Sequence, residues 1–420
     1  MRESYDVFIK AADRIGSYLC KSAFWAGSCC NWIGRSLEDV TSNENSPLPL
    51  VNKALGPDIY DGTSGIAYFL SYLYDYTGQY DYLHFAEGAI NHSLSHIGDI
   101  FPINRFGFYD GGIGIAYVAV KLGCKLDNNL LLDKAMTALK DLSNDIQAEH
   151  LMDIISGNAG AIPALLEIYD TLREQSYYDL AVELGDELLR LAVRNRIGWS
   201  WDHRTNGVES AQNNLTGFSH GAAGIAFSLL ELFRKTGDYK YRAAAEEGFK
   251  YENCWFNETL RNWPDFRPIQ SFRKRQPEGF TYAMAWCHGA PGICLSRIRA
   301  YQILQDRKYL KDCQAALSTV SESMKYPDDI DNDNYSLCHG LGGNCEPLLQ
   351  AYNVFNDEDC RSIANNIGNN GIEKYGNETS RWPCGIQTGQ TPGLMLGLAG
   401  IGHFYLRLYD SKHTPSALML

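Results

Sequence analysis

The sequence predicts an all-α protein, folded as a closed α/α toroid (a double helical barrel) of seven helix-pair repeats. Three observations support this prediction: a Gly-x-x-Gly motif recurs along most of the chain, an apolar helical segment usually follows it, and an amphipathic segment usually comes next. Repeated helix pairs bury their apolar faces by stacking on their neighbours, so several repeats share one core. The seven motifs are Gly62–Gly65, Gly111–Gly114, Gly157–Gly160, Gly221–Gly224, Gly289–Gly292, Gly340–Gly343 and Gly397–Gly400.

The fourth repeat shows the two kinds of helix most clearly. Residues 225–233 are nearly all apolar, which is typical of a helix buried on most sides. A turn over residues 236–239 ends this helix, and residues 241–250 are amphipathic, as an outer helix should be. We therefore expect an inner ring of apolar helices and an outer ring of amphipathic ones. The same succession recurs in residues 66–77 with 82–97, 161–171 with 178–193, and 293–304 with 309–324.

The spacing of the repeats favours a closed ring over an open superhelix. Tetratricopeptide superhelices also use helix pairs, but their period is about 34 residues. The first glycines of successive motifs are here 46 to 68 residues apart. A toroid also explains why the glycine corners are nearly identical, because all of them would converge on one face. Glycine suits such a corner because it lets the backbone turn sharply and two helices approach closely.

We interpret the chain as a single domain, residues 1–420, because no low-complexity linker divides it. Residues 1–50 form an N-terminal extension with a helical run over residues 5–19, a short extended or turn segment over 29–34 and a polar loop over 41–49. Residues 253–282 separate the fourth and fifth repeats. We expect this segment to form a loop or short-strand insertion over the mouth of the channel.

The composition argues against several classes of protein. The 420 residues are 45% hydrophobic and carry a formal net charge of −13, which suits a large core and argues against a nucleic-acid partner. No apolar window reaches the roughly eighteen residues of a membrane span, and the N-terminus lacks a signal-peptide pattern. Twelve cysteines in such a chain indicate reduced thiols and a cytoplasmic location. We expect buried, structural thiols at Cys20, Cys124, Cys254, Cys313 and Cys360.

The residue before each first glycine is predominantly polar. Packing in a core does not explain three histidines, two aspartates and a serine at equivalent positions, so we expect them to point into the central cavity. The inner-helix N–H groups also face this cavity and favour thiolate or other anionic ligands. The seven residues are Asp61, Asp110, Ser156, His220, His288, His339 and Leu396.

Two of these corners carry a Cys-His pair, Cys287-His288 and Cys338-His339, with the cysteines 51 residues apart. Thiolate and imidazole are strong zinc ligands, so the two pairs predict one metal site. All four side chains could close a structural site, or three could bind and leave one position open for catalysis. Neighbouring residues point in different directions, so a Cys and the His beside it need not reach the same ion. Hydrogen-bonded polar residues in a cleft are the simpler interpretation.

The motifs resemble those of the lanthionine synthetase C-like (LanC-like) cyclases. The resemblance rests on Trp286–Gly289, on Cys338–Gly340 and on Thr391–Gly402. The segments Cys30–Trp32 and Asn262–Asp265 are most similar to the cyclase domain of class II lanthipeptide synthetases. The resemblance implies a seven-repeat toroid that binds Zn²⁺.

The resemblance also implies roles for individual residues. Cys287, Cys338 and His339 would hold the zinc, with water or a substrate thiol in the fourth place. His220 would be the catalytic acid/base, and Asp153 would be the family's aspartate near the metal. His288 would either support the groups that touch the metal or face the substrate. One position departs from the pattern: some relatives carry an Arg four residues before the first zinc cysteine, where this chain has Ala283.

The implied reaction follows from the chemistry of sulfur. A free cysteine thiol has a pKa of about 8.5, and coordination to zinc removes its proton. Addition of the thiolate to dehydroalanine or dehydrobutyrine in a dehydrated precursor peptide forms a thioether and an enolate, which an acid then protonates. The partners would be that precursor and a separate dehydratase.

Three other functions stay open. Glutathione or another thiol could be added to dehydroamino acids in proteins, or the chain could be a zinc-stabilised scaffold without turnover. A carbohydrate-active toroid would need paired carboxylates. At the aligned positions only Asp61 and Asp110 could supply them, and thiolates would have no purpose there.

Overall fold

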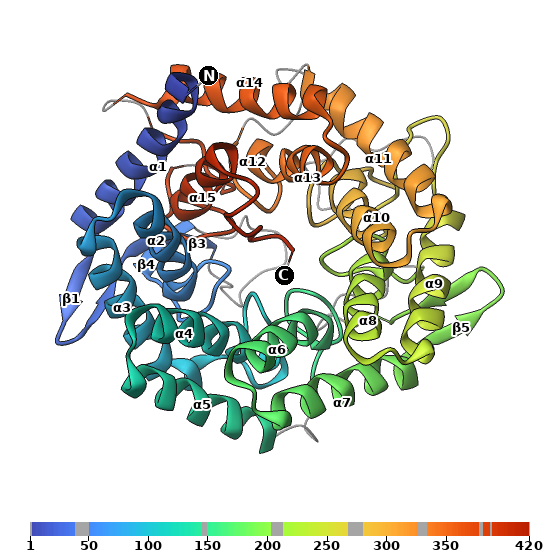
Figure 1. Ribbon diagram of the computed structural model, residues 1–420, viewed down its shortest axis with the longest axis horizontal. Helices are drawn as coiled ribbons and strands as arrows, with labels where there is room; N and C mark the ends of the chain where they lie inside the picture. The colour runs from blue at the N-terminus through green and yellow to red at the C-terminus, as the bar shows by residue number, and fades with distance from the viewer. Residues whose placement is uncertain are drawn as a thin grey trace.

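The computed structural model describes residues 2–37, 50–144, 149–202, 213–267, 280–325, 334–377, 381–386 and 389–419. Its helices form two concentric rings (Figure 1), which confirms the predicted α/α toroid. The inner helices are α2 (Thr63–Thr77), α4 (Gly112–Leu126), α6 (Asn158–Leu172), α8 (Ala222–Thr236), α10 (Ala290–Leu304), α12 (Leu341–Asn344) with α13 (Glu346–Phe355), and α15 (Leu398–Tyr409). The outer helices are α3 (Tyr80–Ser95), α5 (Asn129–Asn144), α7 (Gln175–Leu191), α9 (Tyr239–Cys254), α11 (Arg307–Lys325), α14 (Glu358–Tyr375) and α1 (Arg2–Ser22).

The two ends of the chain close the ring together. The seventh inner helix, α15, is followed by no outer helix, and α1 packs beside it in that place (Figure 1). Phe8 of α1 contacts Tyr405 of α15, with ring centroids 6.1 Å apart. Arg14 donates to the carbonyl of Gly376 at 2.7 Å, which ties α1 to the end of α14. The helical run predicted in the N-terminal extension therefore completes the seventh helix pair.

The second glycine of every motif is required by one repeated contact. In all seven repeats its missing Cβ would lie 1.7 to 2.1 Å from a backbone carbonyl oxygen six residues earlier in the chain. No side chain fits in that space, so the corner segment packs directly on the first turn of the inner helix. At Gly289 the backbone also has φ +92°, a conformation that L-residues rarely adopt.

A closed belt of backbone hydrogen bonds joins the seven corners. In each repeat the residue two places before the first glycine accepts a hydrogen bond from one neighbouring corner, and in six of the repeats its N–H donates to the other neighbour. In the third repeat Ile155 accepts, but the donor is the preceding residue, Ile154. The belt fixes all corners at one depth in the ring. Its N–H to O links are Tyr60 to Tyr109, Tyr109 to Ile155, Ile154 to Ser219, Ser219 to Cys287, Cys287 to Cys338, Cys338 to Met395 and Met395 to Tyr60, all of 2.7 to 3.4 Å.

Short hairpins accompany the helices, and Gly34 in one of them lies against Thr391 and Pro392 of the seventh corner. Strand β1 (Phe24–Ala26) pairs with β2 (Cys29–Asn31), β3 (Ile33–Leu37) with β4 (Leu50–Ala54), and β5 (Val193–Asn195) with β6 (Gly198–Ser200), each antiparallel. Two single-turn 3-10 helices, η1 (Ile97–Asp99) and η2 (Pro102–Asn104), follow α3.

Three tryptophans anchor the segments that follow outer helices. Each donates its indole N–H to a carbonyl in the last turn of the preceding helix, where such carbonyls lack an intrahelical partner. The pairs are Trp32 with Leu19 at 2.7 Å, Trp201 with Leu188 at 2.8 Å, and Trp263 with Glu252 at 3.1 Å.

The insertion predicted over residues 253–282 is described in part. Residues 253–254 finish α9, and isolated bridges pair Asn257 with Asn262 and Asp265 with Thr281. Residues 268–279, with the basic run at 273–275, and the polar loop at 41–49 lie outside the described residues.

The C-terminal tail enters the middle of the ring (Figure 1). Two corner residues hold it: the Tyr109 hydroxyl donates to the carbonyl of Ala417 at 2.9 Å, and the Trp286 indole to that of Leu418 at 3.2 Å. Arg407 of α15 pairs with buried Glu346 at 2.6 Å and donates to tail carbonyls. The tail therefore packs against the same corner segments that carry the predicted site.

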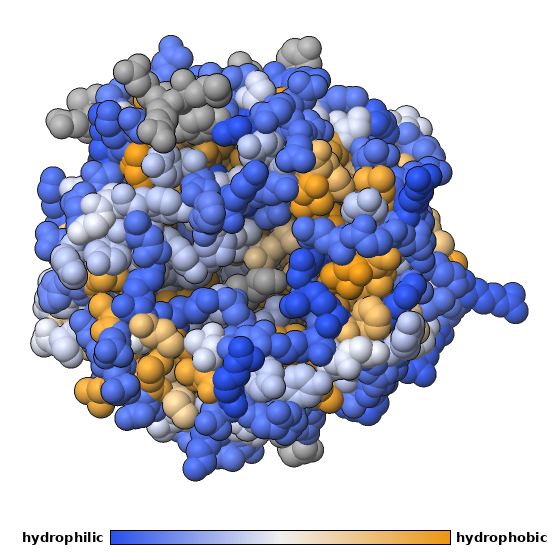
Figure 2. All heavy atoms as spheres, viewed as in Figure 1, coloured by the Kyte–Doolittle hydropathy of each residue, from blue (hydrophilic) through white to orange (hydrophobic). Residues whose placement is uncertain are grey.

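The environment of the cysteines differs from the prediction at two positions. Cys313 and Cys360 are buried and Cys20 is partly buried, but Cys124 and Cys254 are exposed because they lie at the ends of α4 and α9. Figure 2 shows a largely hydrophilic face with apolar side chains in several separate groups. Among the helices of the described ranges, none combines the length and the apolar character that a membrane span requires.

Candidate active site

The belt of hydrogen bonds brings two residues from every corner to one depth in the ring. The first is the belt residue and the second is the residue after it. The second set was predicted in full from the sequence, whereas from the first set only Cys287 and Cys338 were predicted. The pairs are Tyr60 and Asp61, Tyr109 and Asp110, Ile155 and Ser156, Ser219 and His220, Cys287 and His288, Cys338 and His339, and Met395 and Leu396.

Cys287 and Cys338 are neighbours in the belt, where the N–H of Cys287 donates to the carbonyl of Cys338 at 3.4 Å. The hydrogen bond from the Cys338 side chain lowers the pKa of Cys287, burial opposes it, and the positive charges of Arg267 and His220 lower it further. One thiol of the pair therefore loses its proton more readily than an ordinary cysteine. Two adjacent cysteines with a stabilised thiolate are suited to binding a soft metal ion.

Tyr60 is a site residue that the sequence analysis missed. Its hydroxyl donates to the Sγ of Cys338 at 3.0 Å. Burial raises the pKa of this phenol well above its usual value, and the charge of Cys338 adds to the effect, so Tyr60 keeps its proton and remains a donor. Its position in the repeat could have identified it, because Tyr60 lies two residues before Gly62, as Cys287 and Cys338 do before their own first glycines.

His339 is oriented by a backbone carbonyl. Its Nε2 lies 2.9 Å from the oxygen of Gly385. A carbonyl only accepts, so Nε2 carries the proton and Nδ1 is left with the lone pair that a metal needs. Metal-binding histidines are commonly held in this way.

The donor set of Cys287, Cys338 and His339 therefore fits zinc chemistry. Its members are not preassembled, however: across the described parts of the chain, no three His, Cys, Asp or Glu side chains form a ready metal-binding group. Zinc would have to draw the imidazole and the thiols together.

His220 and Asp153 form the second feature of the site. The Nδ1 of His220 lies 2.7 Å from Oδ2 of Asp153, and Oδ1 of Asp153 accepts the Ser156 N–H at 2.7 Å. Asp153 is 1% exposed, whereas the side chain of His220 is 21% exposed. Burial lowers the pKa of His220, but the charge and hydrogen bond of Asp153 outweigh it, so the pKa is raised overall. The pair presents a readily protonated imidazole to the cavity.

Asp153 does not cap the helix that follows it. The residue capping α6 is Gly157. The bond to Ser156 instead stabilises the turn before that glycine and aims the second carboxylate oxygen at His220.

His288 lies behind His220 in the wall of the cavity. It is 1% exposed, and its ring centroid is 5.8 Å from that of His220. Burial lowers the pKa of His288 to about 3, with a further contribution from the charge of Arg267, so the ring is neutral. That it faces the substrate stays a prediction, because so little of it reaches the cavity.

The first corners supply carboxyl groups. Burial raises the pKa of Asp61 to about 7, and Asp58 adds to this effect. Burial likewise raises the pKa of Asp110 to about 7, although its carboxylate accepts hydrogen bonds from Ser156 and Asn104. Each of these two groups is therefore about half protonated at neutral pH.

Arg267 is the second missed residue. It follows the Asn262–Asp265 segment, and its guanidinium pairs with both oxygens of buried Asp265, at 2.7 Å for Nη2 to Oδ2. Arg267 lies in the segment predicted to be an insertion, and its only signal in the sequence is its position two residues after an Asp.

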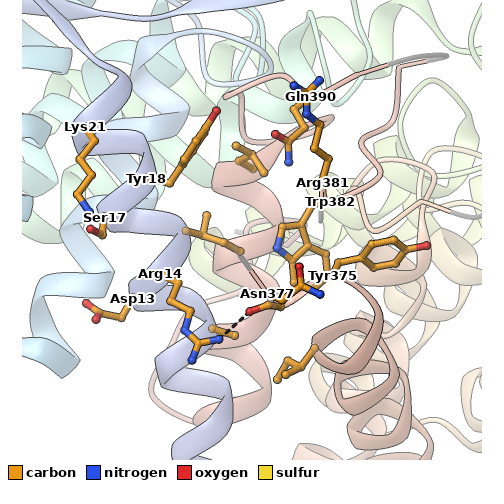
Figure 3. A pocket seen from close by; sticks show the side chains of 15 residues that line it. Asp13, Arg14, Ser17, Tyr18, Lys21, Tyr375, Asn377, Arg381, Trp382 and Gln390 are labelled. Atoms are coloured by element: carbon orange, nitrogen blue, oxygen red, sulfur yellow. Dashed lines mark hydrogen bonds between the residues drawn. The ribbon is translucent and has the colours of Figure 1, made fainter. Parts of the chain in front are cut away.

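A cavity of about 1220 Å³ lies elsewhere, between α1 and the segment after α14 (Figure 3). Arg14, Tyr18, Lys21 and Arg381 are among the residues lining it. It contains none of the predicted site residues, so the candidate site is the corner ring.

Comparison with known proteins gives one family and several similar folds. The pattern of the family described as "Lanthionine synthetase C-like protein" matches residues 53–419. The lacticin 481/lactococcin biosynthesis protein LcnDR2 of Lactococcus lactis subsp. lactis is 24% identical over 433 residues, which cover 99% of this chain. The chain spans only 42% of that relative's length. Glutathione S-transferase LANCL1 of Danio rerio is 21% identical over 306 residues, 71% of this chain and 70% of the relative.

Solved structures share the fold. Nisin cyclase superposes with a TM-score of 0.63 at 19% identity, over 86% of this chain and 90% of its own. A family 76 glycoside hydrolase from a bovine Bacteroides thetaiotaomicron strain superposes with a TM-score of 0.55 at 11% identity. The superposition covers 96% of this chain and 78% of the hydrolase. Because the family pattern covers most of the sequence, this chain belongs to the lanthionine synthetase C-like protein family.

Proposed function

We propose that the chain is a zinc-dependent lanthipeptide cyclase. It adds cysteine thiolates to dehydroalanine or dehydrobutyrine in a dehydrated precursor peptide and so forms lanthionine or methyllanthionine rings. The observation that carries the proposal is the meeting of two thiols, Cys287 and Cys338, with the His220–Asp153 pair on one ring of corners. A scaffold has no need of a polarised histidine beside a metal-binding pair.

Cys287, Cys338 and the Nδ1 of His339 would hold the zinc. Bound zinc supplies one kind of chemistry here: it keeps a substrate thiol deprotonated and nucleophilic at neutral pH. The Tyr60 hydroxyl donates a hydrogen bond to the sulfur of Cys338 and so stabilises the negative charge on that thiolate. The belt keeps the donors at one depth in the ring.

His220 completes the reaction. The sulfur forms a bond to the β-carbon, the alkene electron pair shifts to the α-carbon and the carbonyl oxygen, and His220 delivers a proton to the α-carbon. The proton lost by the substrate thiol restores the imidazolium, so no atom is gained or lost. Asp153 holds the ring in the tautomer that directs Nε2 toward the cavity and stabilises its positive charge.

Names of relatives support the substrate class. One relative takes part in lacticin 481 biosynthesis, and a similar structure is a nisin cyclase. The precursor peptide and a separate dehydratase are proposed partners on that basis. The proposed location is cytoplasmic, where thiols remain reduced.

A second candidate is addition of glutathione to dehydroamino acids in proteins. It is favoured by the similarity to a protein named glutathione S-transferase. The bond formed is the same, but the thiol comes from another molecule.

One experiment separates these functions. Purified chain with bound zinc is mixed with a dehydrated peptide that contains a free cysteine, with and without glutathione. A cyclase removes the alkylatable thiol without a change in peptide mass. A glutathione transferase increases the mass by one glutathione, and a scaffold changes neither quantity.

A further inference from the structure

The segment that carries Arg267 is fixed beside the corner of the fifth repeat. Asn262 donates to the carbonyl of Ala283 at 3.0 Å and accepts the N–H groups of Trp263 and Ala290 at 2.9 and 2.8 Å. The N–H of Asp265 donates to the carbonyl of Thr281 at 2.7 Å. A residue at the end of this segment is therefore positioned by the same corner that carries Cys287.

Asp265 fixes the guanidinium itself. Its two oxygens accept from Nε and Nη2 of Arg267 at 2.7 to 3.2 Å, and its Oδ1 also accepts the Arg267 N–H at 3.0 Å. Asp265 lies 4.0 Å from the Nδ1 of His288, the neighbour of Cys287. An Arg held by a buried carboxylate in a two-pronged geometry loses little further freedom when it binds a substrate.

One side of the guanidinium still faces open space. The Arg267 side chain is 43% exposed although Asp265 is 3% exposed. Its Nη1 makes no hydrogen bond with the described residues, so two N–H groups remain available.

The proposed reaction needs such a group. When the thiolate adds to the β-carbon, negative charge moves to the carbonyl oxygen of the dehydroamino acid. A fixed donor aimed at developing charge is a strong contributor to catalysis. Ala283, at the position where some relatives carry an Arg, cannot serve, because it has no polar side-chain atom.

We infer that Arg267 is a catalytic residue that donates a hydrogen bond to the enolate oxygen of the substrate, with Asp265 as its positioning residue. This inference rests on the proposed function. The carbon–sulfur bond forms as the alkene pair becomes the enolate, Arg267 stabilises the oxygen without transferring a proton, and His220 protonates the α-carbon. The guanidinium and the imidazole therefore act at two ends of one enolate.

The test compares Arg267→Gln and Arg267→Lys with Arg261→Gln. Arg261 is a matched control, since its side chain is also 43% exposed and also pairs with a carboxylate, that of Glu322 at 3.1 Å. We expect Arg267→Gln to lower kcat about 10²- to 10³-fold with a small change in KM. Arg267→Lys should retain part of the wild-type kcat. Arg261→Gln should have the same kcat as the wild-type protein. Zinc content and melting temperature should match those of the wild-type protein.

A second acceptor identifies the step. A peptide with a vinyl ketone in place of the dehydroalanine forms a more stable enolate, so the loss caused by Arg267→Gln should shrink with this acceptor. An equal loss with both acceptors, loss of zinc, or a kcat close to wild type overturns the inference while the proposed function stands. A wild-type chain that forms no thioether overturns both.

Discussion

Two arcs of the same corner ring carry different chemistry. We define the acidic arc as the first three corners, Tyr60–Asp61, Tyr109–Asp110 and Ile155–Ser156, and the cysteine–histidine arc as the next three, Ser219–His220, Cys287–His288 and Cys338–His339. Both arcs have the same glycines, the same close contact at the second glycine and the same hydrogen-bond belt. They differ mainly in two side chains per corner. The difference teaches that the repeat builds the scaffold, while the belt residue and its successor set the chemistry.

The arcs are nevertheless connected. Asp153, just before the third corner, bonds His220 of the fourth, and Tyr60 of the first bonds Cys338 of the sixth. Tyr60 and Asp153 therefore supply a neutral and an anionic partner to the cysteine–histidine arc. This division can be tested from either side.

Removing a thiol from the cysteine–histidine arc should have the largest effect. We expect Cys338→Ala to lose bound zinc and to reduce thioether formation to the uncatalysed rate, because one thiolate and one imidazole hold zinc weakly. Metal analysis and peptide mass spectrometry measure the two outcomes. Cys313→Ala is the control, since Cys313 is equally buried but lies in α11. Full zinc content in Cys338→Ala would refute the assigned ligands.

His220 should come next. We expect His220→Ala to lower kcat about 10²- to 10⁴-fold, the usual contribution of a general acid, while zinc remains bound. The steady-state rate with the dehydrated peptide and the zinc stoichiometry check this. Unchanged kcat would move the proton-donor role to another group.

The link through Asp153 should appear in the pH profile. An acid must be protonated, so kcat falls as the pH rises through the pKa of His220. Asp153 raises this pKa, and Asp153→Asn should therefore shift the alkaline fall to lower pH and reduce the rate about 10- to 100-fold. Asp110→Asn is the matched control in the acidic arc and should leave the alkaline fall in place. An unshifted fall in Asp153→Asn would contradict the pairing.

Tyr60→Phe should change the zinc affinity about tenfold, because it removes the hydroxyl that donates to Cys338. Competition with a chelator measures the affinity. Tyr109→Phe is the comparison at the next corner: its hydroxyl bonds the tail at Ala417, so it should lower stability without changing zinc affinity. Equal affinities in all three proteins would mean that the bond to Cys338 does not matter.

Asp61→Asn should have the smallest effect on activity but a definite one on stability. The folded-state pKa of Asp61 is about 7, above its value of 3.8 in an unfolded chain. Its contribution to stability is thus fully present below pH 4 and is lost as the pH rises to 7. The variant should be more stable than wild type at pH 8 by about 4 kcal/mol, because each unit of the pKa shift is worth about 1.4 kcal/mol, and no more stable at pH 4. Urea unfolding at the two pH values tests the sign.

Much of the fold was predictable because its signals are local. The second glycine of each motif is forced by contact with its own corner, so seven copies are visible in the sequence. Cys287, Cys338, His339 and His220 stand beside those glycines and were found with them. Tyr60 and Arg267 were missed because their roles depend on contacts that the folded ring creates, such as the bond from Tyr60 to Cys338.

The sequence by itself determined the repeat, the helix pairs and the residues that enter the cavity, since glycine contacts and apolar spacing act within one repeat. Only the tertiary structure decided which corners meet. Closing the ring brings Cys287 onto Cys338, Asp153 onto His220 and Tyr60 onto Cys338. It also joins α1 to α15 from opposite ends of the chain. These contacts depend on the closure of the belt, a property of all seven repeats together that no single repeat encodes.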